Sequence, residues 1–441
     1  MTLTSSDLPI PMVFLLAIAI LSIAASVLLY LRRHRYLSGE KPQNIQWADI
    51  WPSILFILIF SGPPKLRARD PLGSIRGDVD YVVLLHLLVW GLAGVWLFYQ
   101  LVVRRLMERR PLLRLWIPQK LGLVLILCLG ASALVSPAPA LTILKVYETL
   151  VMLLFSLLFV QRYGVDACLQ RLFVGSALLV IAIAVSAIIA PDLVMMVGGS
   201  RLTGELIAPA GDTSVFLLIL LCANRQRLPT MRFLILFTLS IVVLIFSRAR
   251  TAYACIGAVL SLVILLRPNL PILRRFAFVT LALLPLAIFS PSISDWIERE
   301  PESVSTLSDR TGLWTSLTDI TLNKSPLIGL GYYAASRVYG PQYNLGLGTA
   351  HSEFIETLVG GGILSATVLV ALWLTLFVYA ASLLRQRKDR IPFVCFSLLM
   401  SIMLSGLTGT AEGPCALGFW CVAAILPTLR VTRAHSSLTN L

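Results

Sequence analysis

The chain has 441 residues, of which 57% are hydrophobic and only 13% are charged. Soluble domains carry about 25% charged residues, so this composition excludes an ordinary soluble enzyme and indicates a membrane protein. The formal net charge of +14 is concentrated in arginine clusters between apolar segments. The positive-inside rule explains such clusters by membrane topology, and nucleic-acid binding is therefore not expected.

Long apolar segments without period-two alternation predict transmembrane helices rather than a β-barrel. The first predicted span covers 9–31, and another full span covers 81–103. Between them, segment 47–60 is apolar but has only about two-thirds of the length of a span. Basic loops flank this segment on both sides, which conflicts with the positive-inside rule if the segment crosses. The chain therefore has about 13 spans if 47–60 crosses and about 12 if it lies in the interface.

The rest of the chain alternates regularly between apolar segments and basic loops. The further predicted spans are 121–136, 140–161, 172–190, 207–223, 233–247, 251–266, 276–290, 352–384, 391–408 and 414–430. The strongest basic cluster, 385–390, belongs on the cytoplasmic side, which places segment 291–350 outside. The 7 cysteines show no CxxC spacing, so neither a disulfide framework nor a metal site is predicted.

The chain accordingly divides into three parts: a transmembrane bundle (1–290), a long outer loop (291–350) and a second part of the bundle (351–441). The loop is too short for a core of its own and is expected to pack on the bundle. Ser308 is placed to cap a helix in which four apolar residues share one face: Leu313, Trp314, Leu317 and Ile320. This amphipathic helix is expected to lie on the membrane surface.

Charged residues on the predicted outer side form a candidate site. Arg201 precedes a span, and Arg248 and Arg250 lie in a short turn between two spans. Arg310 lies at the start of the loop helix. Because a guanidinium fork matches phosphate oxygens, arginines spread over several outer loops predict binding of an anionic headgroup such as a diphosphate. His351 opens the span after the long loop, and a histidine there can exchange a proton near neutral pH.

These residues also have structural explanations, which stay open. An outer arginine at the end of a span can snorkel to lipid phosphates, above all Arg248, Arg250 and Arg337. His351 also fits a helix cap at the interface. The run of glycines at 360–362 predicts close helix packing rather than a ligand-binding loop.

Ionisable residues near these positions give further candidates. Glu353 and Glu356 are three residues apart and share a helix face, so they are candidates for substrate binding together with Trp314. Lys145 and Glu148 lie within an apolar segment, where ionisable residues are functional candidates by default. Their spacing also allows them to neutralise each other. His86 is a further polar residue inside a predicted span.

Three segments resemble the O-antigen ligase and O-antigen polymerase superfamily of bacterial envelope glycosyltransferases. They are Arg201-Leu-Thr-Gly, SDRTGLW followed by SPLIGLG, and AHSEFIETLVGGGIL. The last is similar to the family's His-Asn-x-[Phe/Tyr]-[Leu/Ile]-[Gln/Glu] motif before a glycine-rich helix. The resemblance covers about residues 195–370. Ser352 stands where Asn is usual, and Asp309 where Gly often precedes the arginine, and whether position 352 tunes the acceptor stays open.

The resemblance implies an all-α, GT-C-like bundle in the bacterial inner membrane, with its active site facing the periplasm. It implies an undecaprenyl-diphosphate-linked glycan donor and a saccharide or lipid A-core acceptor, with membrane lipid and other polysaccharide assembly proteins as further partners. The family's essential residues map to Arg201, Arg310 and His351, and neither a metal nor a cofactor is required. The arginines would stabilise the leaving diphosphate. His351 would either deprotonate the acceptor hydroxyl or bind the diphosphate.

The leading interpretation is a polymerase that transfers a growing lipid-linked chain onto the next lipid-linked repeat unit. A ligase that transfers the finished glycan to lipid A-core is the near alternative. A flippase for lipid-linked saccharides would favour charges at mid-membrane and repeated spans, whereas the sequence concentrates its charges at one face and shows no repeat. A scaffold protein would not need arginines in several outer loops.

Overall fold

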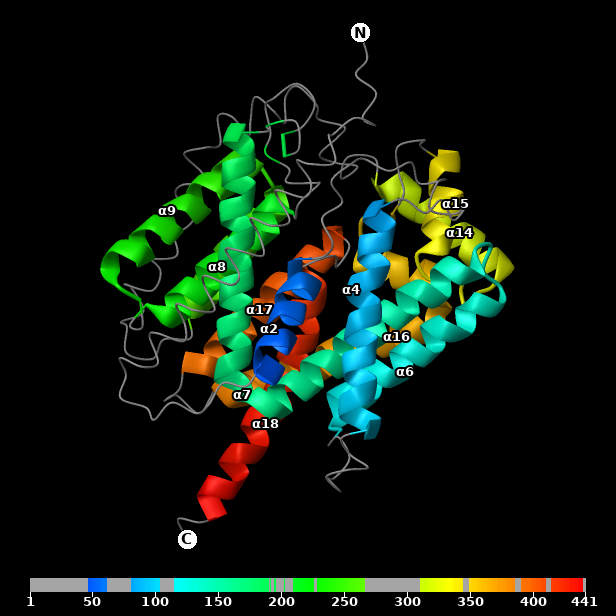
Figure 1. Ribbon diagram of the computed structural model, residues 1–441. Coiled ribbons are helices and arrows are strands. Elements are labelled where there is room, and N and C mark those ends of the chain that lie inside the picture. Colours follow the sequence, from blue (N-terminus) through cyan, green and yellow to red (C-terminus); the bar gives the residue numbers. More distant parts are fainter. Residues whose placement is uncertain are drawn as a thin grey trace.

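The structure is a computed structural model. It describes residues 47–61, 81–103, 115–189, 191, 194–195, 202, 209–225, 228–265, 310–343, 349–384, 390–409 and 414–438. These parts are almost entirely helical (Figure 1). Six helices among them are long and apolar enough to cross a membrane, which confirms the predicted all-α, polytopic membrane fold. The predicted spans 9–31 and 276–290 lie outside the described residues, so the predicted total stays a prediction.

The first half of the chain supplies four of the described helices and two short helical turns. They are α2 (Trp47–Ser61), α4 (Tyr81–Phe98) with the π-helical turn η1 (Tyr99–Val103), α6 (Ile117–Ala131) with the 3-10 turn η2 (Ser132–Leu134), and α7 (Pro139–Ile189). The short helix α2 packs against α7, α4 and α18, and its Phe56 and Phe60 side chains are fully buried. This segment is therefore part of the bundle core, and whether it crosses the membrane stays a prediction.

Helix α7 combines the predicted spans 140–161 and 172–190. Instead of the expected loop between them, the helix bends at Gly164, whose φ of 84° is non-helical. Glycine reaches this region without the steric cost of a Cβ atom, so the chain changes direction at Gly164 and α7 consists of two helical arms joined by a kink. Figure 1 shows the two arms of α7 meeting at this bend.

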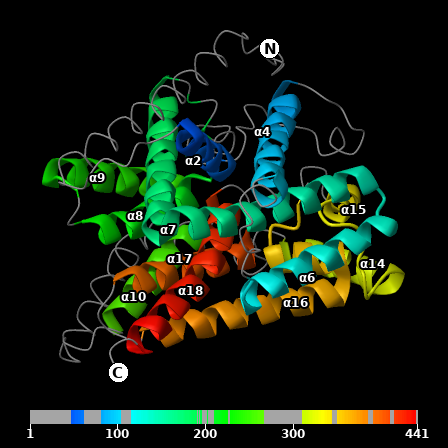
Figure 2. The same cartoon turned by 60° about the horizontal axis from the view of Figure 1, so that its bottom comes forward.

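The second half of the bundle adds the remaining helices. They are α8 (Ala210–Asn224), α9 (Thr230–Ser247), α10 (Arg250–Leu265), α14 (Arg310–Lys324), α15 (Ala334–Tyr343), α16 (Glu353–Leu384), α17 (Arg390–Thr408) and α18 (Pro414–Leu438). Helix α16 runs beside α6 and α18 (Figure 2). Helices α14 and α15 form a pair against α16 at one edge of the bundle.

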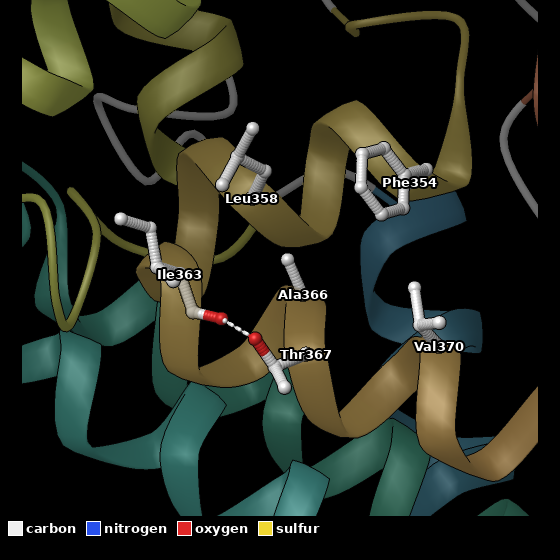
Figure 3. A pocket seen from close by; sticks show the side chains of 6 residues that line it. All are labelled: Phe354, Leu358, Ile363, Ala366, Thr367 and Val370. Carbon is white, nitrogen blue, oxygen red and sulfur yellow. Dashed lines mark hydrogen bonds between the residues drawn. The ribbon is translucent and has the colours of Figure 1, made fainter.

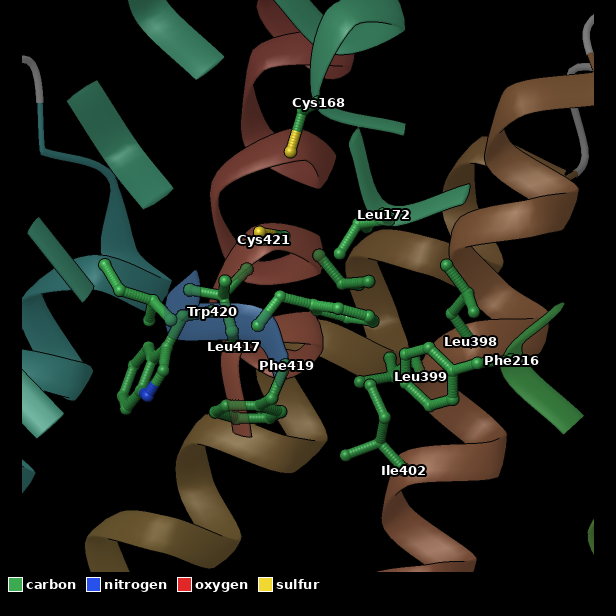
Figure 4. Packing of buried hydrophobic residues seen from close by; sticks show 14 of the residues in the cluster. Cys168, Leu172, Phe216, Leu398, Leu399, Ile402, Leu417, Phe419, Trp420 and Cys421 are labelled. Carbon is green, nitrogen blue, oxygen red and sulfur yellow. The ribbon is translucent and has the colours of Figure 1, made fainter. Parts of the chain in front are cut away.

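The core is built around α18, which packs against α7 and α17 (Figure 4). Leu417, Cys421 and Leu172 are fully buried there. The Phe216 ring of α8 lies beside Leu398 and Leu399 of α17 (Figure 4). Lipid is about as apolar as leucine, so such contacts stabilise the bundle chiefly through van der Waals packing. Large apolar side chains on the outside of the helices, such as Leu127 and Ile188, are exposed as expected for lipid-facing positions.

Candidate functional site

His351 lies at the junction between the long loop and α16. Its φ of 51° places it in the left-handed region, which is rare for residues other than glycine. The next residue, Ser352, is buried, and its hydroxyl accepts a hydrogen bond from the Ile355 amide at 3.4 Å. Ser352 is thus the N-cap of α16, and His351 stands half-buried just before the cap.

Helix α14 brings Arg310 to the same corner. Its Leu313 and Leu317 side chains are fully buried and belong to a small apolar cluster with Ala350 and Val359. One face of the helix therefore packs against α16, as expected for a loop that rests on the bundle. Arg310 is half-buried and is the first residue of this helix.

The link between the two segments is the Trp314 indole, whose Nε1 donates to the Ala350 carbonyl at 2.6 Å. Residues four apart lie one above the other on a helix, so Arg310 is one turn away from this contact. Ala350 directly precedes His351. The predicted catalytic residues Arg310 and His351 are therefore brought to one corner of the fold, with Trp314 as the connection.

The two predicted acidic residues have different environments. Glu356 is fully buried and accepts hydrogen bonds from the Ser336 hydroxyl at 2.7 Å and the Ala350 amide at 2.9 Å. Its contacts hold α15 and the turn before His351. Glu353 is half-buried and accepts a hydrogen bond from the Tyr332 hydroxyl at 3.2 Å. Glu353 is therefore the more accessible of the two to a ligand.

The Tyr332 hydroxyl is buried near the carboxylates of Glu353 and Glu356. Burial raises the pKa of Tyr332 well above its usual range, and the nearby charges of Glu353 and Glu356 raise it further. The hydroxyl therefore stays protonated and serves as a donor to Glu353 throughout the physiological pH range.

The glycines of this region make close backbone contacts, as the sequence predicts for the run at 360–362. Helix α16 breaks at Gly362, with a φ of 70°, and the segment 326–331 pairs with the break. The Leu330 amide donates to the Val359 carbonyl and the Gly331 amide to the Gly360 carbonyl, both at 2.9 Å. The elbow at Pro326, Gly329 and Gly331 is thus locked against α16.

The predicted arginines of the α9–α10 turn lie at a second group of helix ends. Arg248 is exposed and ends α9 with a φ of 47°, and Arg250 begins α10. Arg201 lies outside the described residues. The residue after it, Leu202, donates its amide to the Phe246 carbonyl at 2.9 Å, two residues before Arg248.

The end of α17 connects this turn to the His351 corner. The Ser405 hydroxyl donates to Asp212, at the start of α8, at 2.6 Å. One turn later, the Gly409 carbonyl accepts the Glu353 amide at 3.1 Å. The start of α8 in turn packs on the α9–α10 turn, because a Cβ on Gly211 would lie 2.7 Å from the Ala249 Cβ. The helix ends that carry the predicted outer residues therefore gather at one end of the bundle.

The structure also joins polar residues that the sequence leaves apart. His86 Nε2 lies 2.6 Å from Glu148 Oε1, and Lys145 Nζ lies 2.9 Å from Glu148 Oε2. Lys145 also lies over the ring of Tyr333, and so does Arg337. The i,i+3 spacing of Lys145 and Glu148 predicts their pairing, but no local signal indicates the contacts with His86 and Tyr333.

An open apolar depression lies along α16 (Figure 3). Its lining residues are Phe354, Leu358, Ile363, Ala366, Thr367 and Val370. Thr367 is the polar one, and its hydroxyl donates to the Ile363 carbonyl of the same helix at 2.8 Å. We assign this depression to lipid contact rather than chemistry. Across the described parts of the chain, no three His, Cys, Asp or Glu side chains gather as a metal site would require.

The fold and this corner define a polytopic membrane protein whose polar residues converge at one end of a helical bundle. Residues 213–370 match the family model of O-antigen ligase. The match runs from α8 to α16 and contains Arg248, Arg310 and His351, and it confirms the resemblance that the sequence motifs indicate. No curated protein matches the chain.

Proposed function

We propose that this protein is an inner-membrane glycosyltransferase that acts on undecaprenyl-diphosphate-linked saccharides at the periplasmic face and polymerises the repeat units of a surface polysaccharide. The observation that carries the proposal is the hydrogen bond from Trp314 to Ala350. It joins the start of the Arg310 helix to the turn of His351 within the segment that matches O-antigen ligase.

The chemistry needs a charge stabiliser and a proton acceptor. Arg310, supported by Arg201 and by Arg248 and Arg250 of the neighbouring turn, neutralises the diphosphate as the glycosidic bond breaks. His351 takes the proton of the acceptor hydroxyl. Attack from the face opposite the diphosphate inverts the anomeric carbon, and the reaction uses neither a metal nor a cofactor.

The acidic residues act around this centre. Glu353, held by Tyr332, contacts the sugar that is to be transferred or extended. Glu356 is fully buried, so it supports the site by holding the turn before His351. Trp314 anchors the loop helix and presents Arg310 to the substrate.

Transfer assays with the purified protein test the proposal. With a lipid-linked repeat unit as both donor and acceptor, a polymerase gives a ladder of longer lipid-linked products. With lipid A-core as acceptor, a ligase gives glycosylated core and no ladder. Absence of both products with an authentic donor would refute the proposed activity.

The periplasmic placement has its own test. Gln342 in α15 is exposed, so a Gln342→Cys variant in a cysteine-free background should react with a membrane-impermeant maleimide added from the periplasmic side. Labelling from the cytoplasmic side alone would reverse the orientation and remove the basis for a periplasmic reaction.

A further inference from the structure

The Arg337 side chain in α15 has one guanidinium nitrogen without a hydrogen-bond acceptor among the described residues. The residue is half-buried, and its Nη1 atom is buried without a hydrogen-bond partner among the described residues. A buried charged donor without an acceptor is costly. A snorkelling arginine would instead place its guanidinium in water or among headgroups, so the buried Nη1 atom favours a bound acceptor over that alternative.

A second cation shares the same aromatic neighbour. The Arg337 Cζ lies 5.4 Å from the centroid of the Tyr333 ring, and the Lys145 Nζ lies 5.5 Å from it. Glu148 pairs with Lys145 at 2.9 Å and with His86 at 2.6 Å. The charge of Lys145 is therefore compensated within the protein, whereas the described residues supply no hydrogen-bond acceptor for Nη1 of Arg337.

The backbone at Tyr333 holds this arrangement in place. Tyr333 has a φ of 59° and its side chain is buried. A left-handed conformation at a non-glycine residue costs of order 1–3 kcal/mol and persists only where the surroundings enforce it. Here it directs the tyrosine ring towards both cations.

Arg337 also belongs to the His351 corner. The preceding residue, Ser336, donates to Glu356, and Glu356 accepts the amide of Ala350, which precedes His351. The carboxylate of Glu356 thus lies between the two segments. An anion bound at Arg337 would therefore lie in the part of the fold that holds the turn before His351.

We propose that Arg337, together with Lys145 beside Tyr333, binds phosphate oxygens of an undecaprenyl-diphosphate-linked substrate. This inference rests on the proposed function and extends its phosphate-binding residues beyond the arginines expected from the sequence. The planar guanidinium supplies the paired donors that phosphate oxygens accept. Lys145 adds a positive charge near the phosphate, and Glu148 stays paired because it also contacts His86.

Equilibrium binding of labelled undecaprenyl diphosphate, with the full-length protein in nanodiscs of neutral phosphatidylcholine, tests the inference. Losing a charge-assisted hydrogen bond to phosphate should weaken binding about 10-fold or more in Arg337→Gln. Arg337→Lys should recover part of the affinity. The double variant Lys145→Met with Glu148→Gln removes both charges together and should weaken binding less than Arg337→Gln does.

Lys324 provides a matched control in the same pair of helices. Its Nζ lies 4.7 Å from the Tyr339 ring centroid and the side chain is exposed, so Lys324→Gln should bind undecaprenyl diphosphate like the wild type. A parallel titration with undecaprenyl phosphate, and with phosphatidylglycerol replacing part of the neutral lipid, distinguishes the diphosphate from ordinary lipid phosphates. If phosphatidylglycerol competes with undecaprenyl diphosphate through Arg337, the inference is overturned and Arg337 binds bulk lipid.

Two other results separate the inference from the proposed function. If the wild type binds and transfers normally and Arg337→Gln does too, the inference fails and the proposed function stands. If the wild type itself binds no undecaprenyl diphosphate, the proposed function fails. An equal loss of affinity in Lys324→Gln would show a general charge effect and would also overturn the role of Arg337.

Discussion

The carboxylate of Glu356, on α16, accepts a hydrogen bond from the Ser336 hydroxyl, on α15, at 2.7 Å. Its other oxygen accepts the backbone amide of Ala350 at 2.9 Å, and the side chain is fully buried. One carboxylate therefore fixes the spacing between the segment that ends before His351 and the helix that carries Arg337.

Replacing this carboxylate should destabilise the protein. Glu356→Ala leaves the buried Ala350 amide without its acceptor, which costs about 1–3 kcal/mol. The Ser336 hydroxyl then keeps only its 3.4 Å contact with the Tyr333 carbonyl. We expect the Tm in detergent to fall by about 1–3 °C, and transfer activity to fall because the turn before His351 is released. Glu356→Gln keeps one acceptor oxygen, so its Tm should fall less. An unchanged Tm in Glu356→Ala would show that the contacts are dispensable.

The break in α16 gives a second prediction. At Gly362 the φ is 70°, and an added Cβ would lie 2.3 Å from the carbonyl carbon of Leu327. Gly362→Ala therefore combines left-handed strain of about 1–2 kcal/mol with a backbone clash, and we expect low yield and a clearly lower Tm. Gly91→Ala is the control, since nothing lies within 4 Å of its added Cβ. Equal stability of the two variants would contradict the close contact between the elbow and α16.

The helices could be predicted from the sequence because span length and loop charge are local properties. The bend at Gly164 could not, since a glycine between two apolar segments looks the same in a bend and in a helix. The corner at His351 was only partly predictable. Its motif marks His351 and Arg310, but the contact of Trp314 with Ala350 joins residues far apart in sequence. The burial of the Arg337 Nη1 atom, which has no hydrogen-bond partner among the described residues, depends on tertiary packing and could not be predicted from the sequence.

Arg310 tests the need for a guanidinium rather than a positive charge. Arg310→Lys keeps the charge but loses the planar fork that binds two phosphate oxygens, so we expect kcat/KM for transfer to fall about 10-fold or more. The control is Arg225→Lys, because Arg225 lies over the Phe233 ring on the predicted cytoplasmic side. Similar, mild effects in both variants would mean that Arg310 interacts with lipid and not with the substrate.

Tyr332 predicts a loss of stability at alkaline pH. Burial, and then the charges of Glu353 and Glu356, raise the pKa of Tyr332 in the folded state. The folded protein therefore holds this proton more tightly than the unfolded chain. The resulting stabilisation is complete below about pH 10 and is lost as the pH rises through the folded-state pKa. Tyr332→Phe removes the titrating group, so its Tm should depend less on pH above about pH 10. Identical pH profiles would contradict the raised pKa.

His351 carries the sharpest prediction, because the proposed mechanism makes it the proton acceptor. His351→Ala should abolish transfer, while the Tm and the binding of the lipid-linked donor stay close to those of the wild type. The helix cap is Ser352 and not His351, so removing the imidazole does not uncap α16. The wild-type rate should fall as the pH drops below about 6.5, because a general base must start neutral.

The same measurements separate the two roles that His351 can have. A base affects the chemical step, so donor binding should not change in His351→Ala. A phosphate ligand affects binding, so the variant would bind the donor more weakly and its residual rate would not depend on pH. Ser352→Ala removes the cap and should cost about 0.5–2 kcal/mol of stability, which lowers the Tm. Its residual rate should still depend on pH as in the wild type. Full transfer activity in His351→Ala would remove His351 from the mechanism.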